Sequence, residues 1–249
     1  MSYLTLDSST TTQAAEDFTI QFVPPLVLET GNTYEIALIK ANLWNSWYNI
    51  SAAQNNRTLR YYNGSIWRTT TIPDGQYNIE NLDTQIKYIM KSFGDYTAIS
   101  GDTYYINLIP NYSTGKVAIG ISNSYQLDLT GTSFAGILGY SLAIVSTNTS
   151  GGSTIADVTA GINSIFIHCD LCSGSSFSNG VGSDVLHTFV PQSAPNSSIE
   201  ISPINPIYLS INTTQIQRVR MYITDQMGRN ISFNGNPVTY SLSLRLRKN

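Results

Sequence analysis

The stretch TYEIALIKANLWNSW, residues 33–47, decides the fold class of this chain. Its apolar residues Tyr34, Ile36 and Leu38 alternate along a run that is long enough to cross a whole sheet. Successive side chains of a β-strand point to opposite faces, so a period of two is typical of a strand with one face in a core. The stretch therefore predicts a long strand that is buried on one side.

Most of the remaining chain shows the same pattern between turns. DFTIQFV (17–23) alternates apolar and polar residues and ends at Pro24-Pro25. Hairpins are expected at Asn63-Gly64, with a type I′ turn, and at Asn111–Gly115. Further strands are expected in INSIFIHCDLC, DVLHTFV, IEISPINPIYLSI, IQRVRMYIT and VTYSLSLRLR. We find no repeat and no linker, so one domain is expected.

One segment has a helical period instead. NIENLDTQIKYIMKSFG (78–94) places its apolar residues on one face of a helix over residues 79–93, with Asn78 as N-cap and Gly94 as stop. We expect this helix to cover an open face or end of a sheet; a partner-binding helix is the alternative. The chain is thus predicted to be all-β, a single jelly-roll sandwich of two antiparallel sheets with one inserted amphipathic helix.

The composition favours protein contacts. Charged residues make up 12% of the chain and the net charge is −3, whereas about a quarter of residues are charged in an average protein. The only basic run is the tail Arg245, Arg247 and Lys248, which argues against a nucleic-acid-binding arm. No apolar run approaches the ~18 residues of a membrane-spanning helix, and the N-terminus lacks the features of a signal peptide. We expect no specific nucleic-acid partner and no membrane span.

The stretch SIFIHCDLCSG (164–174) contains a Cys-x-x-Cys pair, Cys169 and Cys172. In a continuous strand their side chains point apart and their Cα atoms are about 10 Å apart, beyond the ~7 Å reach of a disulfide. A shared zinc would need both sulfurs within ~2.3 Å of the metal. We expect no metal and no cofactor unless the strand ends at Asp170 and turns sharply. Ile167 should face the core and His168 the other side.

Signals for catalysis are weak, so we expect no enzyme. GTSFAG (131–136) departs from a nucleophile elbow at Ala135. Asp184 and His187 lie three positions apart in a strand pattern and should point to opposite faces. A Ser-His-Asp site assembled from distant residues stays open.

Three aromatic residues cluster where the long strand ends: Trp44, Trp47 and Tyr48. They suit core and rim packing, or else an interface or sugar-stacking platform. We take them as candidate interface residues.

Six stretches occur in an order that resembles a known family. They are LWNSWYNI (43–50), IPDGQYNIENLDTQI (72–86), FAGILGYS (134–141), INSIFIHCDL (162–171), NPIYLSINTTQIQRVRMYITDQMGRNISFNG (205–235) and YSLSLRLRK (240–248). Together they resemble the penton-type minor capsid proteins of the Polinton/Maverick elements and virophages. The resemblance begins near residue 17, so residues 1–16 are expected to be an N-terminal arm and residues 17–249 the jelly-roll domain. It departs at 52–70, which is expected to be a hairpin insertion.

The resemblance implies a structural virion protein without catalysis or cofactor. It implies a penton subunit, five copies of which form the fivefold vertex of an icosahedral capsid and contact the double jelly-roll major capsid protein. The main alternative is a carbohydrate- or receptor-binding jelly roll, such as a spike or lectin domain, because fold alone does not decide function. An enzyme on a β-scaffold and the sole coat protein of a small virus are further alternatives.

Overall fold

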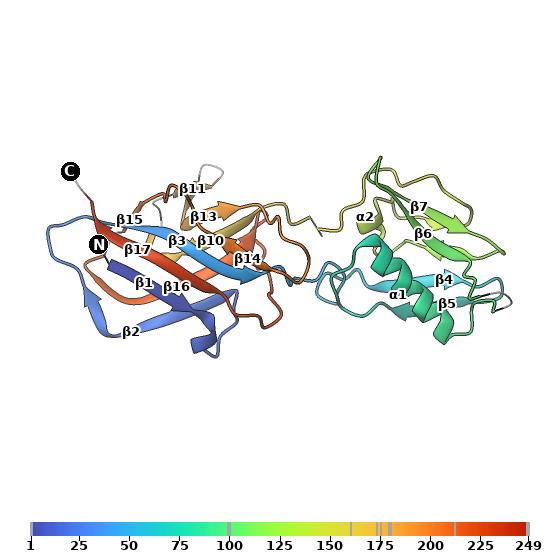
Figure 1. Ribbon diagram of the computed structural model, residues 1–249, viewed down its shortest axis with the longest axis horizontal. Coiled ribbons are helices and arrows are strands. Elements are labelled where there is room, and N and C mark those ends of the chain that lie inside the picture. The colour runs from blue at the N-terminus through green and yellow to red at the C-terminus, as the bar shows by residue number, and fades with distance from the viewer. Residues whose placement is uncertain are drawn as a thin grey trace. The chain divides into compact units, whose positions relative to one another are not determined.

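Two compact units make up the chain in the computed structural model, which describes residues 2–98, 101–159, 161–172, 174, 176–178, 181–211 and 213–247 (Figure 1). Unit 1 combines Met1–Trp47 with Ile162–Asn249, and unit 2 is Tyr48–Gly161. Each unit buries a separate hydrophobic cluster. The structure therefore differs from the single domain expected over 17–249, because residues 48–161 enclose a core of their own.

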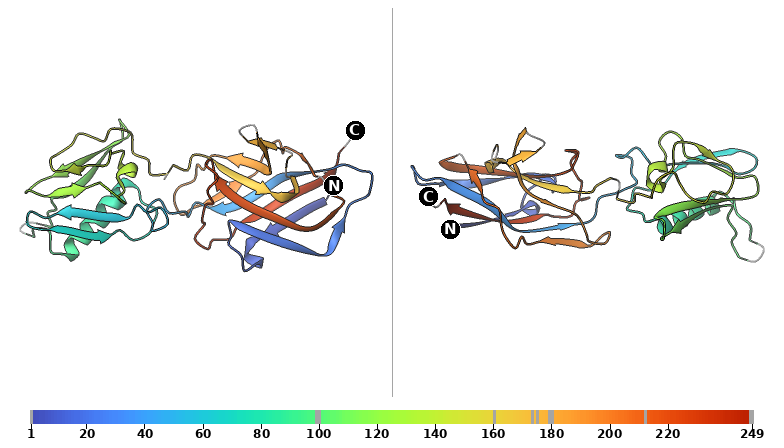
Figure 2. Two further views of the ribbon diagram at one scale, coloured as in Figure 1. Left: turned by 180° about the vertical axis from the view of Figure 1, so that it is seen from behind. Right: turned by 90° about the horizontal axis from the view of Figure 1, so that it is seen from above.

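Unit 1 is built from two antiparallel sheets. The first has the order β1 (Ser2–Asp7), β17 (Thr239–Leu246), β3 (Tyr34–Trp44) and β14 (Ser198–Ile201), and β15 (Leu209–Ile211) also pairs with β3. The second has the order β13 (Val185–Phe189), β10 (Ile165–Cys169), β16 (Gln215–Asp225) and β2 (Asp17–Val27). This order, with its crossovers between sheets, is that of a jelly roll, as predicted (Figures 1 and 2).

Strand β3 confirms the long strand expected at 33–47. Ile36 and Leu38 face the core between the sheets, as their alternation predicts. The register with β17 then shifts, so that Ile39 has no partner and Ala41 and Leu43 become the buried residues. A β-bulge of this kind adds one residue to one strand. It explains why the alternation of the sequence changes phase in the middle of the strand.

The first residues are part of the jelly roll and not a separate arm. Strand β1 pairs with β17 along its whole length, from Ser2 opposite Leu244 to Asp7 opposite Thr239. Leu6 is buried in the core of unit 1. A 3-10 turn, η1 (Ser8–Thr10), follows, and β2 begins at Asp17. The expected arm over residues 1–16 is therefore corrected to an edge strand and its connection to β2.

Unit 2 contains both α-helices that the structure describes, together with a four-stranded sheet and a two-stranded sheet. One sheet has the order β5 (Trp67–Thr71), β4 (Thr58–Tyr62), β8 (Gln126–Asp128) and β9 (Ile144–Val145). A second sheet pairs β6 (Ile106–Asn111) with β7 (Lys116–Ile121). The helices are α1 (Ile79–Ser92) and α2 (Ala135–Leu138). In unit 1 a small ribbon pairs β11 (Ser176–Ser178) with β12 (Val181–Ser183), and η2 (Asp170–Cys172) follows β10.

Helix α1 agrees with the helix expected over 79–93. The side chain of Asn78 accepts a hydrogen bond from the backbone N–H of Asn81 at 2.7 Å, which is the geometry of an N-cap. Its apolar face is buried in the core of unit 2, through Ile79, Leu82, Ile86, Ile89 and Met90. The helix thus supports the inserted unit, and it does not belong to the core of the jelly roll.

The β4–β5 hairpin overlaps the expected insertion at 52–70 and ends one residue beyond it, at Thr71. Its turn differs from the type I′ geometry. A type I′ turn needs positive φ at both central residues, and here Gly64 has φ of 88° while Asn63 does not have a positive φ. The side chain of Asn63 instead accepts hydrogen bonds from the backbone N–H groups of Ser65 and Ile66, at 3.1 and 2.9 Å. This side-chain acceptor stabilises a four-residue loop.

Candidate functional site

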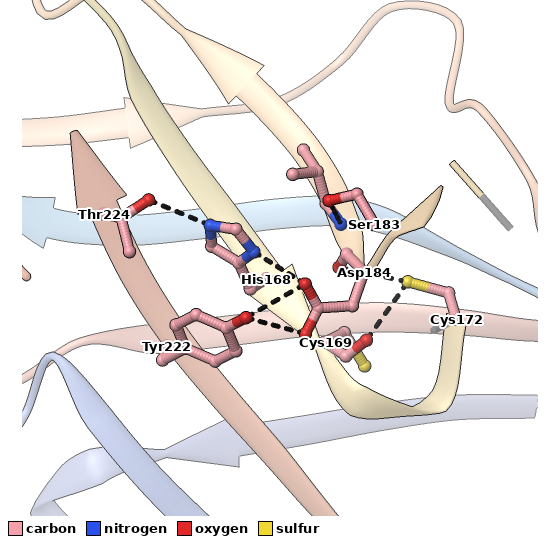
Figure 3. A network of polar contacts seen from close by, with 8 residues as sticks. His168, Cys169, Cys172, Ser183, Asp184, Tyr222 and Thr224 are labelled. Atoms are coloured by element: carbon pink, nitrogen blue, oxygen red, sulfur yellow. Dashed lines mark hydrogen bonds and ion pairs between the residues drawn. The ribbon is translucent and has the colours of Figure 1, made fainter. Parts of the chain in front are cut away.

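A buried polar cluster lies on the face of the second sheet that points away from the core of unit 1 (Figure 3). Its centre is His168 on β10, whose neighbours Ile167 and Cys169 face the core, as predicted. The imidazole Nδ1 is 2.9 Å from Oδ1 of Asp184, and Nε2 is 2.9 Å from Oγ1 of Thr224. Both ring nitrogens therefore have a partner inside the protein.

Tyr222 completes the cluster. Its hydroxyl donates to both carboxylate oxygens of Asp184, at 2.9 and 2.8 Å. Its ring stacks on the imidazole of His168, with 4.2 Å between centroids and 8° between planes. Burial and the Asp184 carboxylate raise the pKa of Tyr222 well above its usual value, so the hydroxyl stays a donor.

Strand register explains why these residues meet. His168 lies opposite Tyr222 of β16, and the register with β13 shifts between Ile167 and His168. Because of this shift, Leu186 is an extra residue on β13 without a partner on β10. The backbone N–H of Cys169 then donates a hydrogen bond to the carbonyl oxygen of Asp184, at 3.0 Å. Bulges often re-aim a side chain in this way. The sequence contains no short-range signal for it, because His168 lies on β10, Thr224 on β16 and Asp184 just before β13.

The hydrogen bonds join a carboxylate (Asp184), an imidazole (His168) and a hydroxyl (Thr224) in series, as in a catalytic triad. Burial, however, restricts its chemistry: Thr224 is 5% exposed and His168 is 9% exposed. A nucleophile must meet its substrate, and this hydroxyl is covered. Buried polar groups that are fully hydrogen-bonded stabilise one arrangement of the strands. The cluster therefore suits a structural link between β10, β13 and β16.

His187 does not join this cluster. It lies opposite Ile167 in the register between β13 and β10 and is half-buried. Burial lowers the pKa of His187 below its usual value. Asp184 and His187 thus take part in separate environments, in line with the expectation that they do not form one site.

An ion pair continues the polar face toward β2. The Nε and Nη2 atoms of Arg220 lie 2.8 and 2.7 Å from the two carboxylate oxygens of Asp17. The same guanidinium lies 4.8 Å from the centre of the Tyr222 ring. The hydrogen bond from Arg220 holds the pKa of Asp17 below its usual value. This bidentate pair links two strands that are far apart in the sequence.

Cys169 and Cys172 are buried free thiols. The chain turns sharply between them, which the sequence analysis considered only as an exception to a continuous strand. Strand β10 ends at Cys169 and the chain turns through η2, so the argument from opposite faces of one strand was wrong. The thiol of Cys172 contacts the carbonyl oxygens of Cys169 at 3.2 Å and Asp184 at 3.4 Å. A hydrogen bond with Cys172, together with burial, raises the pKa of the Cys169 thiol. Among the described residues, no group of three or more His, Cys, Asp or Glu side chains could hold a metal ion.

The candidate interface residues Trp44, Trp47 and Tyr48 have different environments. Trp47 is 6% exposed and packs edge-on against Phe233, with 6.2 Å between ring centroids. Its assignment to an interface is corrected, because its side chain is already used in the core of unit 1. Trp44 and Tyr48 are 39% and 36% exposed, and they belong to different units.

Two of the three basic residues near the C-terminus, Arg245 and Arg247, are paired inside unit 1, and Lys248 lies outside the described residues. Nη2 of Arg245 is 3.1 Å and Nε of Arg247 is 3.8 Å from the carboxylate oxygens of Glu35. Arg245 also lies over the ring of Tyr208.

In the described part of the chain, no helix is long and apolar enough to cross a bilayer.

These features define a jelly-roll protein with a second unit inserted between β3 and β10. The chain matches no family model and no curated protein. Its fold is similar to that of the mavirus penton protein in a crystal structure, with a TM-score of 0.50, 11% identity, and coverage of 99% of this chain and 100% of that chain. It also matches a chain in a cryo-EM structure of the Sputnik virophage, with a TM-score of 0.42, 10% identity, and coverage of 99% and 98%. The chain thus has a penton-like jelly-roll fold, which confirms the predicted fold class.

Proposed function

We propose that this chain is a structural virion protein, the penton subunit of a virophage-type icosahedral capsid. It acts by assembly, without catalysis or a cofactor, and its location is the capsid. The observation that supports this proposal is the fold shared with the mavirus penton protein over nearly the whole of both chains, including the inserted unit.

Five copies form a ring at each vertex and contact a double jelly-roll major capsid protein. A cyclic ring needs two different flanks on each subunit. The jelly roll has two flanks, because each of its sheets has two edges. On one side the edge strands are β1 and β2, and on the other they are β13 of the second sheet and β14 with β15 of the first. Edge strands have unpaired backbone groups and readily join a neighbouring chain. The flanks of unit 1 are therefore the contact surfaces in this proposal.

The polar features of unit 1 agree with a role in assembly. In the Asp184–His168–Thr224 cluster, the imidazole and the hydroxyl are buried. The carboxylates of Asp17 and Glu35 form ion pairs with arginines of the same chain. Few charges remain to repel a second copy. Low charge at the centre of an interface is typical of protein–protein contacts.

The test is assembly with a virophage-type double jelly-roll major capsid protein, followed by cryo-EM reconstruction of the particles. We expect density for unit 1 at the fivefold positions. Val27→Asp places a charge on an exposed position of edge strand β2 and should reduce vertex occupancy severalfold. The matched control, Tyr112→Asp, changes an exposed residue in the β6–β7 turn of unit 2 and should assemble normally.

Two results would contradict the proposal. One is density for the chain at positions other than the fivefold vertices, and the other is its absence from particles that form normally. Either result would favour the alternative, a receptor-binding jelly roll.

A further inference from the structure

We propose that the outer face of the β5-β4-β8-β9 sheet in unit 2 binds a neutral oligosaccharide, with Trp67 and Tyr62 as its stacking platform. This inference concerns a surface of unit 2 and does not depend on the capsid function. The resemblance to penton-type proteins implies no role for β4 and β5, because it departs at residues 52–70.

The side chains on this face are arranged in rows across the strands. Leu59, Tyr61 and Leu127 are buried in the core of unit 2, so the alternate residues point outward. Tyr62 on β4 lies opposite Trp67 of β5 on one side and opposite Gln126 of β8 on the other. Adjacent strands are about 4.8 Å apart, so this row spans about 10 Å. That length suits two linked sugar rings.

The aromatic pair presents an exposed ring surface. The ring centroids of Tyr62 and Trp67 are 5.6 Å apart with 49° between their planes, and Trp67 is 36% exposed. The guanidinium of Arg60 lies 4.3 Å from the centre of the Trp67 ring. This cation–π contact holds the indole in place before any ligand arrives, which lowers the entropy cost of binding. A pyranose ring has one face of C–H groups, which packs on such a surface.

The charged side chains of this face pair with each other, so the face suits an uncharged ligand. The next row contains Thr69, Arg60, Asp128 and Ile144, in register across the four strands. Arg60 forms an ion pair with Asp128, and Thr130 also donates to the Asp128 carboxylate at 2.6 Å. The positive and negative charges of the row therefore cancel. A sulfated or sialylated sugar would find no unpaired cation among the described residues of this face.

Uncommitted polar groups surround the rings. Within the described residues, the hydroxyls of Tyr62 and Thr69 and the amide of Gln126 form no hydrogen bond. They supply both donors and acceptors, which is what the hydroxyl groups of a sugar need. A binding site with one aromatic surface and a few converging polar groups is typical of small polar ligands. Carbohydrate is thus the class of ligand that matches this face in shape, charge and hydrogen bonding.

The experiment is calorimetric titration of the full chain with cellotriose, maltotriose, lactose and N,N′,N″-triacetylchitotriose, with 3′-sialyllactose as a charged comparison. We expect at least one neutral sugar to bind, and Trp67→Ala to weaken its affinity by about tenfold or more. Tyr62→Phe removes one hydroxyl and should weaken binding by about threefold. Tyr112→Ala, which removes an exposed aromatic ring from the β6–β7 turn, should leave the affinity unchanged.

The proposal is overturned if no neutral sugar binds, if only sialyllactose binds, or if Trp67→Ala and Tyr62→Phe bind as tightly as the parent chain. Sedimentation velocity is measured on the same samples. A change in self-association by Trp67→Ala without a change in sugar affinity would assign the face to a protein partner and would also overturn the proposal. If Trp67→Ala does not fold, Tyr62→Phe and Thr69→Val decide the outcome.

Discussion

Nδ1 of His168 and Oδ1 of Asp184 are 2.9 Å apart, on the face of the second sheet that turns away from the jelly-roll core. In an antiparallel sandwich this face is usually solvated and tolerant of substitution. Here it contains a covered polar cluster, with the ring of Tyr222 stacked on the imidazole. The outer face of the sheet therefore contributes to stability in addition to the apolar core.

His168→Ala should lower the free energy of unfolding by about 1–3 kcal/mol, because it leaves the buried hydroxyl of Thr224 and one bond of Asp184 without a partner. Urea denaturation of the variant and the parent chain measures this change. Ile167→Asp should be more damaging, since it buries an unpaired carboxylate in the core. A change below about 0.5 kcal/mol for His168→Ala would contradict a structural role for the cluster.

Asp17→Asn should lower stability at neutral pH by no more than about 1 kcal/mol, because Asp17 and Arg220 are partly exposed to solvent. The folded chain holds the pKa of Asp17 below its ordinary value of 3.8. The ion pair therefore stabilises the fold above that value, and its contribution is lost as the pH falls through the lower pKa of the folded state. The difference between variant and parent should shrink in acid. An unchanged difference at pH 2.5 and pH 7 would contradict the assignment.

His187→Gln should flatten the stability profile between about pH 7 and pH 5. Burial lowers the pKa of His187 in the folded state, so the unfolded chain binds its proton more readily. Stability from the neutral imidazole is present above the unfolded value near 6.5 and is lost as the pH falls through the folded value. Thermal unfolding at a series of pH values, with the parent chain alongside, gives the comparison. Parallel profiles for the two proteins would refute this prediction.

The two cores should respond to separate substitutions. Ile36→Ala removes a buried side chain from unit 1, and Leu82→Ala removes one from unit 2, at a cost of about 2–5 kcal/mol each. Hydrogen exchange followed by mass spectrometry should show faster exchange in residues 162–249 for Ile36→Ala, and in residues 48–161 for Leu82→Ala. Equal acceleration in both units by either variant would show that they unfold as one.

Neither cysteine should react with a thiol reagent in the folded chain, because both Cys169 and Cys172 are buried and burial helps to raise the pKa of the Cys169 thiol. Titration with Ellman's reagent should detect no thiol in buffer and two in urea without reductant. Fewer than two thiols in urea would indicate a disulfide, contrary to this structure.

Local patterns predicted the parts of the fold that depend on nearby residues. The alternation around Ile36 and the period of helix α1 identified a strand and a helix, because each pattern is complete within about fifteen residues. The division into two units was not predicted, because strands and turns look alike in both. Only packing shows that Leu59 and Leu82 share one core while Ile36 and Ile165 share another.

The candidate site was less predictable for the same reason. The directions of the Ile167 and His168 side chains could be inferred within one strand. The partners of His168 come from elsewhere, because Thr224 lies on β16 and Asp184 just before β13. The turn after Cys169 was considered only as an exception, because a pattern of alternating residues does not state where a strand stops. Trp47 illustrates a further limit, since an aromatic residue at a strand end suits a core and an interface equally well.

The place of β17 in its sheet has a consequence for synthesis. This strand follows all the other described strands along the chain, yet it lies between β1 and β3, which are among the first to leave the ribosome. Unit 2 is complete when residue 161 has emerged, but the first sheet lacks its middle strand until residue 246 is available. Pairing over such long separations forms late and slowly. A chain that stops before residue 239 therefore presents an unfinished first sheet to chaperones and proteases, so that unit 1 folds only once β17 is available.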